Sequence, residues 1–177
     1  MSNFYNMRGG EQMEGLLSMV NDLGNTKEMT MIEIGSYMGD STIVFAENFK
    51  KVISIDPFIN NYDDKEYPTE FAALSLVYDK FIENTSKLNN LIHIRKKSDD
   101  AIFDIQEKVD FVYIDGHHTY EQVKKDIENY RKLINDNGII GGHDYSVVGW
   151  KDVIKAVNEC LGVPDNVYVD CSWIKKI

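Results

Sequence analysis

The chain has 177 residues, the usual size of one domain, and its 43% hydrophobic and 27% charged residues are ordinary for a globular protein and exclude a disordered or fibrous chain. Acidic residues outnumber basic ones by 29 to 19, which gives a net charge of −10. This charge argues against a nucleic-acid partner, because it would repel a phosphate backbone.

The beginning of the chain lacks the apolar run of a signal peptide, and no stretch of about 18 apolar residues occurs anywhere. Cys160 and Cys171 are the two cysteines, and their spacing matches neither a disulfide scaffold nor a zinc knuckle. We therefore expect a single domain over residues 1–177 that is cytoplasmic and has no membrane partner. Whether it forms a homo-oligomer is left open by the sequence.

The first half of the chain contains a strand, a glycine turn and a helix in succession, which is one βα unit. A second strand ends at Asp56-Pro57, because proline cannot continue a central ladder. The expected elements, in order, are a helix over 13–23, strands over 30–34 and 52–55 with a helix over 41–49 between them, a polar loop over 60–68 and a long helix over 69–88.

The second half repeats the alternation of strands and helices. Its clearest helix covers 120–134, where Thr119 and Gln122 fit a capping box and Gly138 stands just beyond the end. The other expected elements are strands over 91–94 and 109–114, a short helix over 99–106, a strand that begins at 139, a helix over 150–161 and an extended region over 167–177 that is broken near 170–172.

Five strands that are each followed by a helix predict an α/β fold, in which a parallel sheet is covered by helices on both faces. Such sheets bind ligands beyond the carboxyl ends of their strands. Three of the four histidines fall at those ends. The polar residues expected there are Ser36, Asp56, Ser98, Asp99, Asp115, His117, His118, His143 and Asp144.

The turn after the first strand distinguishes between cofactors. Gly35 and Gly39 allow a sharp turn beneath a ligand, and Asp56 follows about 20 residues later, where a carboxylate suits the hydroxyls of a ribose. Ser36 and Tyr37 break the nicotinamide-binding pattern, and the residue before Ser41 is an acid rather than the lysine of a P-loop. S-adenosylmethionine has a cationic sulfonium and no phosphate, so an acidic turn tolerates it better than a nucleotide.

Four stretches together resemble the class I S-adenosylmethionine-dependent methyltransferases, and most closely the small O-methyltransferase branch related to macrolide-sugar O-methyltransferases and cephalosporin hydroxylase-like proteins. The resemblance covers nearly the whole chain and implies a Rossmann-like, doubly wound sheet that is mostly parallel with an antiparallel C-terminal strand. The stretches are Glu33-Ile-Gly-Ser-x-x-Gly-x-Ser-Thr42, Ile55-Asp56, Phe111-Val-Tyr-Ile-Asp-Gly-His-His-Thr-Tyr-Glu121 and Gly138-Ile-Ile-Gly-Gly-His-Asp-Tyr145.

The resemblance also implies a cofactor site for S-adenosylmethionine. Glu33 and the glycine turn would surround the methionine part, Asp56 the ribose, and Ser98-Asp99 the adenine. The cofactor-binding residues implied in this way are Glu33, Gly35, Ser36, Gly39, Ser41, Asp56, Ser98, Asp99 and Asp115.

The resemblance further implies catalytic roles for His118, Asp115 and Asp144, with His118 as the general base. In metal-using relatives the corresponding acidic positions hold Mg²⁺, and here they are Asp115, His143 and Asp144. His143 replaces a carboxylate, and imidazole suits transition metals better than Mg²⁺, so whether a divalent metal binds, and which one, stays open. A helix cap is the alternative for His118.

The predicted function is therefore O-methylation of a small hydroxyl-bearing acceptor such as a sugar, a phenol or a natural product. A catalytically silent or divergent ligand-binding member of the fold is the alternative, and a nicotinamide oxidoreductase is a distant third. Among the remaining aromatic and histidine residues, His93, Trp150 and Trp173 are expected to be structural, whereas Tyr62 and Tyr67 fit either a substrate lid or an exposed connector.

Overall fold

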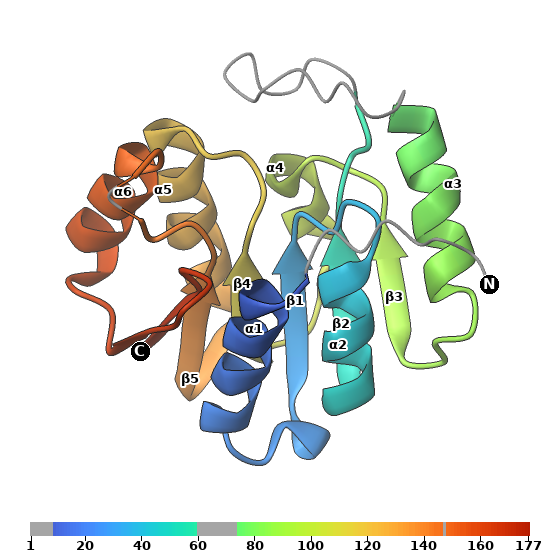
Figure 1. The fold of residues 1–177 in the computed structure, drawn as a ribbon, viewed down its shortest axis with the longest axis horizontal. Helices are drawn as coiled ribbons and strands as arrows, with labels where there is room; N and C mark the ends of the chain where they lie inside the picture. Colours follow the sequence, from blue (N-terminus) through green and yellow to red (C-terminus); the bar gives the residue numbers. More distant parts are fainter. Residues whose placement is uncertain (1–8, 60–73, 147) are drawn as a thin grey trace.

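The computed structural model describes residues 9–59, 74–146 and 148–177, which form one sheet with helices on both faces (Figure 1). The sheet has seven strands in the order β3-β2-β1-β4-β5-β7-β6. The strands are β1 (Thr30–Ile34), β2 (Lys51–Ile55), β3 (Leu91–Ile94), β4 (Val109–Ile114), β5 (Ile134–Gly142), β6 (Asn166–Val167) and β7 (Trp173–Lys176).

The sheet is parallel from β3 to β5, and β7 pairs antiparallel with both β5 and β6. The expected Rossmann-like arrangement with an antiparallel strand in the C-terminal hairpin is thus confirmed. Because strand order reverses between β1 and β4, the carboxyl ends of these two strands border the crevice where such sheets bind ligands.

Within the part of the chain that the structure describes, six α-helices cover the sheet, and the side chains along each strand point alternately into two hydrophobic cores. Ile32 of β1 packs with the helices of one face, and its neighbour Met31 packs with those of the other. The helices are α1 (Glu11–Asp22), α2 (Asp40–Asn48) and α3 (Leu74–Thr85) on one face and α4 (Ser98–Ala101), α5 (Tyr120–Tyr130) and α6 (Lys151–Leu161) on the other. No helix in the described ranges is long and apolar enough to cross a membrane.

Three expected boundaries were wrong. The helix predicted over 120–134 ends at Tyr130 and continues as one 3-10 turn, Arg131–Leu133, so Ile134 belongs to β5 and Gly138 does not close a helix. The strand expected to begin at 139 begins at Ile134, and a register shift between Val109 and Phe111 accommodates the polar residues that follow Ile134. The short helix expected over 99–106 is α4 followed by the 3-10 turn Ile102–Asp104.

The other elements agree with expectation within one or two residues, apart from the expected helix over 69–88. That helix ends at Thr85 instead of 88, and its part before Leu74 lies outside the described residues, as does the expected loop over 60–68 with Tyr62 and Tyr67. Trp173 is 1% exposed and belongs to the core, as predicted. His93 packs among Phe58, Tyr78 and Phe81, and burial lowers its pKa.

Candidate active site

The turn after β1 brings two strand ends into backbone contact. Gly35 and Gly39 have φ of +88° and +90°, a region that side chains rarely adopt. A Cβ atom on Gly35 would lie 2.0 Å from the carbonyl oxygen of Asp115, at the end of β4. Only glycine therefore lets the turn lie against the end of β4.

Asp56, at the end of β2, holds the same turn from the other side. Its Oδ2 accepts hydrogen bonds from the backbone N–H groups of Ser36 (3.1 Å) and Tyr37 (3.0 Å), and its Oδ1 accepts one from Phe58 (2.9 Å). A carboxylate has about four acceptor positions. The side chain thus orders the turn, and its predicted contact with a ribose stays a prediction.

Glu33 is completely buried at the end of β1, where it joins this strand to the beginning of α2. Its two carboxylate oxygens accept hydrogen bonds from the hydroxyls of Ser41 and Thr42, each at 2.6 Å. These contacts give Glu33 and Ser41 a role in fixing the turn. Their contact with a cofactor remains a prediction.

Ser98 and Asp99 begin α4, after β3, and α5 holds them in place. The amide nitrogen Nε2 of Gln122 lies 3.2 Å from Ser98 Oγ and 3.3 Å from Asp99 Oδ1. The predicted capping box is therefore wrong, because Gln122 turns toward α4 and the Thr119 hydroxyl bonds to Nδ1 of His117 (2.9 Å) instead.

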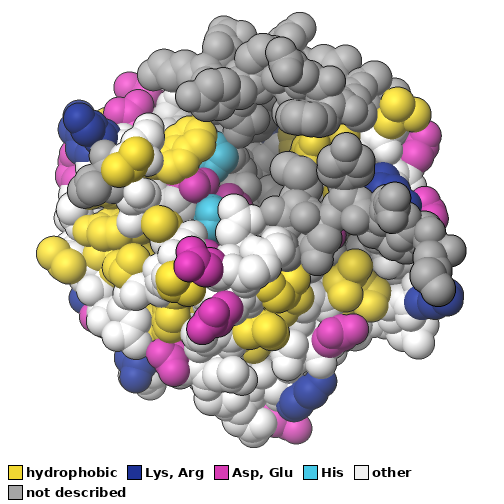
Figure 2. Space-filling view, viewed as in Figure 1, with side chains coloured by type: hydrophobic (Ala, Val, Ile, Leu, Met, Phe, Trp, Pro, Cys, Tyr) yellow, Lys and Arg dark blue, Asp and Glu magenta, His cyan; other side chains and the backbone are white. Residues whose placement is uncertain are grey.

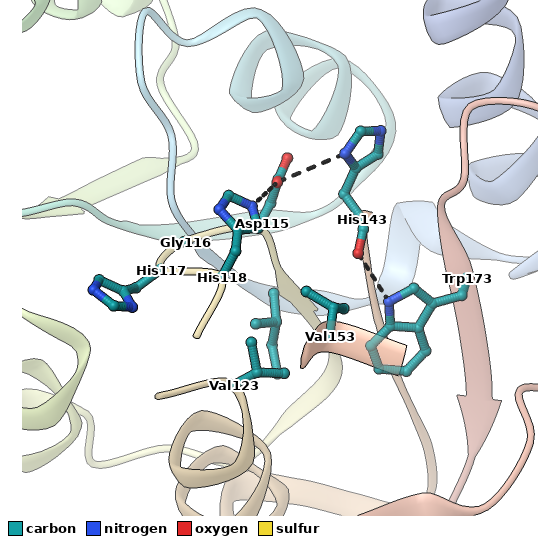
Figure 3. A pocket seen from close by; sticks show the side chains of 9 residues that line it. Asp115, Gly116, His117, His118, Val123, His143, Val153 and Trp173 are labelled. Carbon is teal, nitrogen blue, oxygen red and sulfur yellow. Dashed lines mark hydrogen bonds and ion pairs between the residues drawn. The ribbon is translucent and has the colours of Figure 1, made fainter. Parts of the chain in front are cut away.

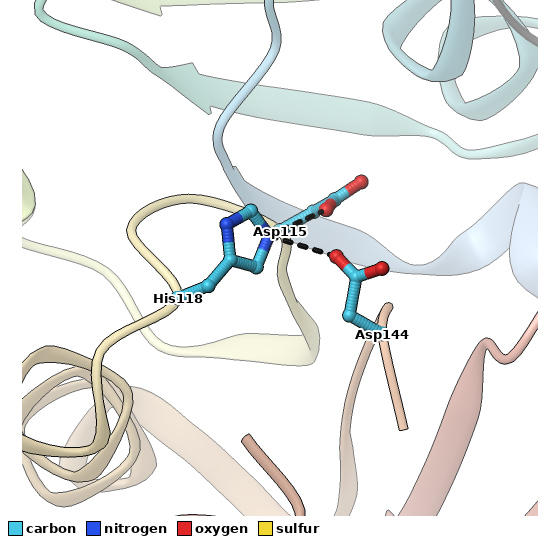
Figure 4. Close-up of side chains that lie close together, drawn as sticks. All are labelled: Asp115, His118 and Asp144. Atoms are coloured by element: carbon cyan, nitrogen blue, oxygen red, sulfur yellow. Dashed lines mark ion pairs between the residues drawn. The ribbon is translucent and has the colours of Figure 1, made fainter. Parts of the chain in front are cut away.

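Histidine and carboxylate side chains meet at the ends of β4 and β5 (Figure 4). Nε2 of His118 lies 2.8 Å from Oδ2 of Asp144 and 3.7 Å from Oδ1 of Asp115. These three side chains are each about 15% exposed, so they are mostly shielded from water yet reachable. Burial alone would raise the pKa of Asp144, but the hydrogen bonds from His118 and His143 hold that pKa below its usual value.

His143 lies on the side of Asp115 opposite His118 (Figure 3). Its Nδ1 is 3.2 Å from Asp144 Oδ1 and 3.8 Å from Asp115 Oδ1. Among the described residues, however, the group whose ligand atoms all lie within 4.8 Å of one another consists of Asp115, His118 and Asp144. This group contains His118 where the expected metal trio has His143, and the trio of Asp115, His143 and Asp144 stays a prediction.

Aromatic rings and a small pocket border this cluster. Trp150 lies at the beginning of α6, and the centroid of its ring is 4.3 Å from that of the His118 ring. Trp150 therefore belongs to the site and not only to the core. The pocket is lined by side chains of both strand ends, including Asp115, His118 and His143 (Figure 3), and histidine and acidic side chains adjoin on the molecular surface (Figure 2). His117 points away from Asp115.

The sequence profile of a family described as a methyltransferase domain matches residues 32–145, more than half of the chain. The chain belongs to this methyltransferase family. The matched stretch begins within β1 and ends after β5, so it includes the glycine turn, Asp56, Asp115, His118 and Asp144. S-adenosylmethionine is the methyl donor that the family implies.

Uncharacterized protein R132 of Acanthamoeba polyphaga mimivirus is 31% identical over 158 residues. The match covers 81% of this chain and 65% of R132, so the chain spans just under two thirds of that relative. The solved O-methyltransferase NovP has a TM-score of 0.69 at 15% identity, covering 94% of this chain and 79% of NovP. An rRNA methylase from Streptococcus thermophilus has a TM-score of 0.61 at 12% identity, covering 90% and 93%. Such neighbours share the fold of S-adenosylmethionine-dependent methyltransferases.

Proposed function

We propose that this methyltransferase-family chain transfers a methyl group from S-adenosylmethionine to the hydroxyl of a small acceptor. The observation that carries the proposal is the position of His118, which lies 2.8 Å from Asp144 and beside Asp115 at the strand ends that border the glycine turn. An imidazole paired with a carboxylate suits removal of a hydroxyl proton at neutral pH. The O-methyltransferase NovP is among the neighbours that share the fold.

The residues around the glycine turn fit the cofactor. The turn approaches β4 so closely that no Cβ atom fits at Gly35, and Asp56 accepts hydrogen bonds from its backbone, so the turn is held in place beside the crevice. Asp56 would accept hydrogen bonds from the ribose hydroxyls at its remaining acceptor positions. Asp99 would accept a hydrogen bond from the exocyclic amine of the adenine. When bound, S-adenosylmethionine supplies a methyl group on a cationic sulfonium, which leaves as a neutral thioether.

The chain's own contribution to the reaction is the handling of one proton and the orientation of the acceptor. His118 would take the proton of the hydroxyl as the oxygen forms its bond to the methyl carbon. Asp144 stabilises the imidazolium that results, because its carboxylate lies within hydrogen-bond distance of Nε2. Trp150 lies against the His118 ring and would form a wall of the acceptor site. Holding both substrates in line supplies much of the remaining rate.

A divalent metal is a second element of the proposal. Two carboxylates and one imidazole, from Asp115, Asp144 and His118, fit a transition metal better than Mg²⁺. Such an ion would orient the acceptor hydroxyl and favour its deprotonation. In that case His118 would be a ligand, and His143, 3.2 Å from Asp144, would be the remaining imidazole able to accept the proton.

The test is formation of S-adenosylhomocysteine from S-adenosylmethionine in the presence of sugar, phenol and RNA acceptors. We expect product with a small hydroxyl compound and none with RNA, since the net charge of −10 opposes binding to a phosphate backbone. Repeating the assay in chelator, with Mn²⁺ or Mg²⁺ restored, decides the metal: full activity in chelator would remove it. Tight cofactor binding with no turnover on any acceptor would instead favour a silent, ligand-binding member of the family.

A further inference from the structure

A buried carboxylate lies beneath the beginning of α4 and takes no part in the proton transfer proposed above. Asp126, in the middle of α5, is 1% exposed. Its Oδ1 lies 3.1 Å from Nε2 of Gln122, the same nitrogen that reaches Ser98 and Asp99. An amide has two N–H groups, so three acceptors share two hydrogens and the orientation of Gln122 depends on how strongly each acceptor attracts them.

Two further contacts from α5 hold the same segment. The hydroxyl of Tyr130, which is fully buried, donates to the carbonyl oxygen of Ser98 at 2.7 Å. Lys125 pairs with the second carboxylate oxygen of Asp99, also at 2.7 Å. Ser98 and Asp99 are thus held by a set of side chains from one helix, and Asp126 is the most deeply buried charge-bearing member of that set.

Burial raises the pKa of Asp126 to about 7, and the hydrogen bonds from Ser98 and Gln122 partly oppose that shift. The charged groups that face it are Asp99, which raises the pKa, and Lys125, which lowers it. The carboxyl therefore changes its charge within the physiological range, whereas an ordinary surface aspartate is ionised throughout it.

We propose that Gln122 and Asp126 are positioning residues that orient Ser98 and Asp99 toward the adenine ring, and that the affinity for the cofactor increases as the pH rises through neutrality. This inference rests on the proposed cofactor site. The geometry that carries it is the bridge from Asp126 through Nε2 of Gln122 to the two residues that begin α4.

The direction follows from the charge of Asp126. Below neutrality the carboxyl is protonated and is a weaker acceptor for Gln122 and Ser98. Above neutrality the carboxylate accepts charge-assisted hydrogen bonds, which are stronger, and these fix the orientation of Ser98 and the Gln122 amide. The added negative charge also lies near Asp99, where it favours the exocyclic amine of adenine as a donor. Both effects increase the affinity for the cofactor as the pH rises.

The experiment is a calorimetric titration with S-adenosylhomocysteine and with adenosine at pH 6 and pH 8. Adenosine is included because it has no group that titrates in this range. We expect both ligands to bind about 5- to 10-fold more tightly at pH 8, the effect of one strengthened hydrogen-bond set. Asp126→Asn keeps the shape without the charge, so its affinity should be the same at both pH values.

Two other variants complete the test. Glu128→Gln removes an exposed carboxylate from the same helix and should keep the wild-type dependence on pH. Gln122→Met removes the bridging amide but retains the side-chain length. It should bind less tightly at pH 8 and show a smaller dependence on pH than wild type, even if Asp126→Asn does not fold, because only the direct effects of Asp126 on Ser98 and Asp99 remain. A dependence on pH that persists in Asp126→Asn, or that is undiminished in Gln122→Met, would overturn the inference alone. Failure of wild type to bind either ligand at both pH values would overturn the proposed cofactor site as well.

Discussion

The polar side chains at the carboxyl ends of the strands have different roles in the two halves of the sheet. On the β1 and β2 side, Glu33 and Asp56 are bound to hydroxyls and backbone N–H groups of the adjoining turn. On the β4 and β5 side, His118, His143 and Asp144 face one another and remain about 15% exposed. The first half is a preformed surface, whereas the second contains acids and bases whose protons can move.

This difference predicts how each half responds to substitution. Because the polar groups of the first half also fix the backbone, their loss should lower cofactor affinity and stability together. Loss of a group in the second half should lower turnover while the cofactor still binds. Three substitutions can break or sharpen this division, and a fourth tests the buried carboxylate of α5.

The largest effect is expected for His118→Ala, which should lower turnover by about 10²–10⁴-fold, the usual contribution of a general base. Affinity for S-adenosylhomocysteine should stay within about twofold of wild type, since His118 belongs to the second half. Steady-state kinetics and calorimetry measure the two quantities. The matched control is His117→Ala, which removes the neighbouring imidazole that bonds to Thr119 and should leave turnover nearly unchanged. Loss of cofactor binding and thermal stability in His118→Ala would make His118 a structural residue.

Gly35→Ala tests the contact between the halves. Its Cβ would lie 2.0 Å from the backbone oxygen of Asp115 at φ +88°, so the two strand ends must separate. We expect a loss of about 3 kcal/mol in the free energy of unfolding, together with weaker cofactor binding. Gly24→Ala has the same φ of +88° with no atom within 4 Å of the added Cβ, so it isolates the backbone strain. Equal losses for both variants in denaturant unfolding would argue against the close contact.

Asp56→Ala should weaken binding of S-adenosylhomocysteine by about 10- to 100-fold, because it removes a charged hydrogen-bond acceptor from the ribose and releases the backbone of the turn. Asp110→Ala is the matched control. Asp110 also accepts a backbone N–H, that of Thr30 at 2.8 Å, but at the opposite end of β1. It should lower stability without changing affinity. Unchanged affinity in Asp56→Ala, measured by calorimetry, would remove Asp56 from the cofactor site.

The smallest effect concerns the stability contributed by Asp126. Its folded pKa of about 7 is raised above the usual value for an aspartate, so the stability it contributes is present at low pH and is lost as the pH rises through 7. Between pH 6 and pH 8, wild type should lose about 1.4 kcal/mol relative to Asp126→Asn. Urea unfolding at the two pH values measures the difference. An identical pH dependence in both proteins would contradict the raised pKa.

The sequence was sufficient to predict the order of strands and helices along the chain and the strand ends where the candidate site lies. Periodic hydrophobic residues located α5 and α6, and glycine with a spaced acid located the turn and Asp56. These signals are local, or depend only on the rule that parallel strands end at one edge of a sheet.

The contacts that the sequence did not predict are those in which a side chain has several chemically equivalent partners within reach. Gln122 occupies a capping-box position, yet its amide finds Ser98, Asp99 and Asp126 across the α4–α5 contact. In the same way His118 and His143 both follow strand ends and both lie within 4.0 Å of Asp115 and Asp144, yet only His118 completes a group of possible metal ligands among the described residues. Spacing in the sequence does not record which way a side chain turns.

The most direct test of the central claim, that the β1 and β2 half binds S-adenosylmethionine, is a calorimetric titration of wild type with S-adenosylhomocysteine and, separately, with NAD. The preformed turn and its lack of a dinucleotide pattern predict one S-adenosylhomocysteine per chain with micromolar affinity and no detectable NAD binding. Tighter binding of NAD, or no binding of S-adenosylhomocysteine, would contradict the assignment of this half as the cofactor site.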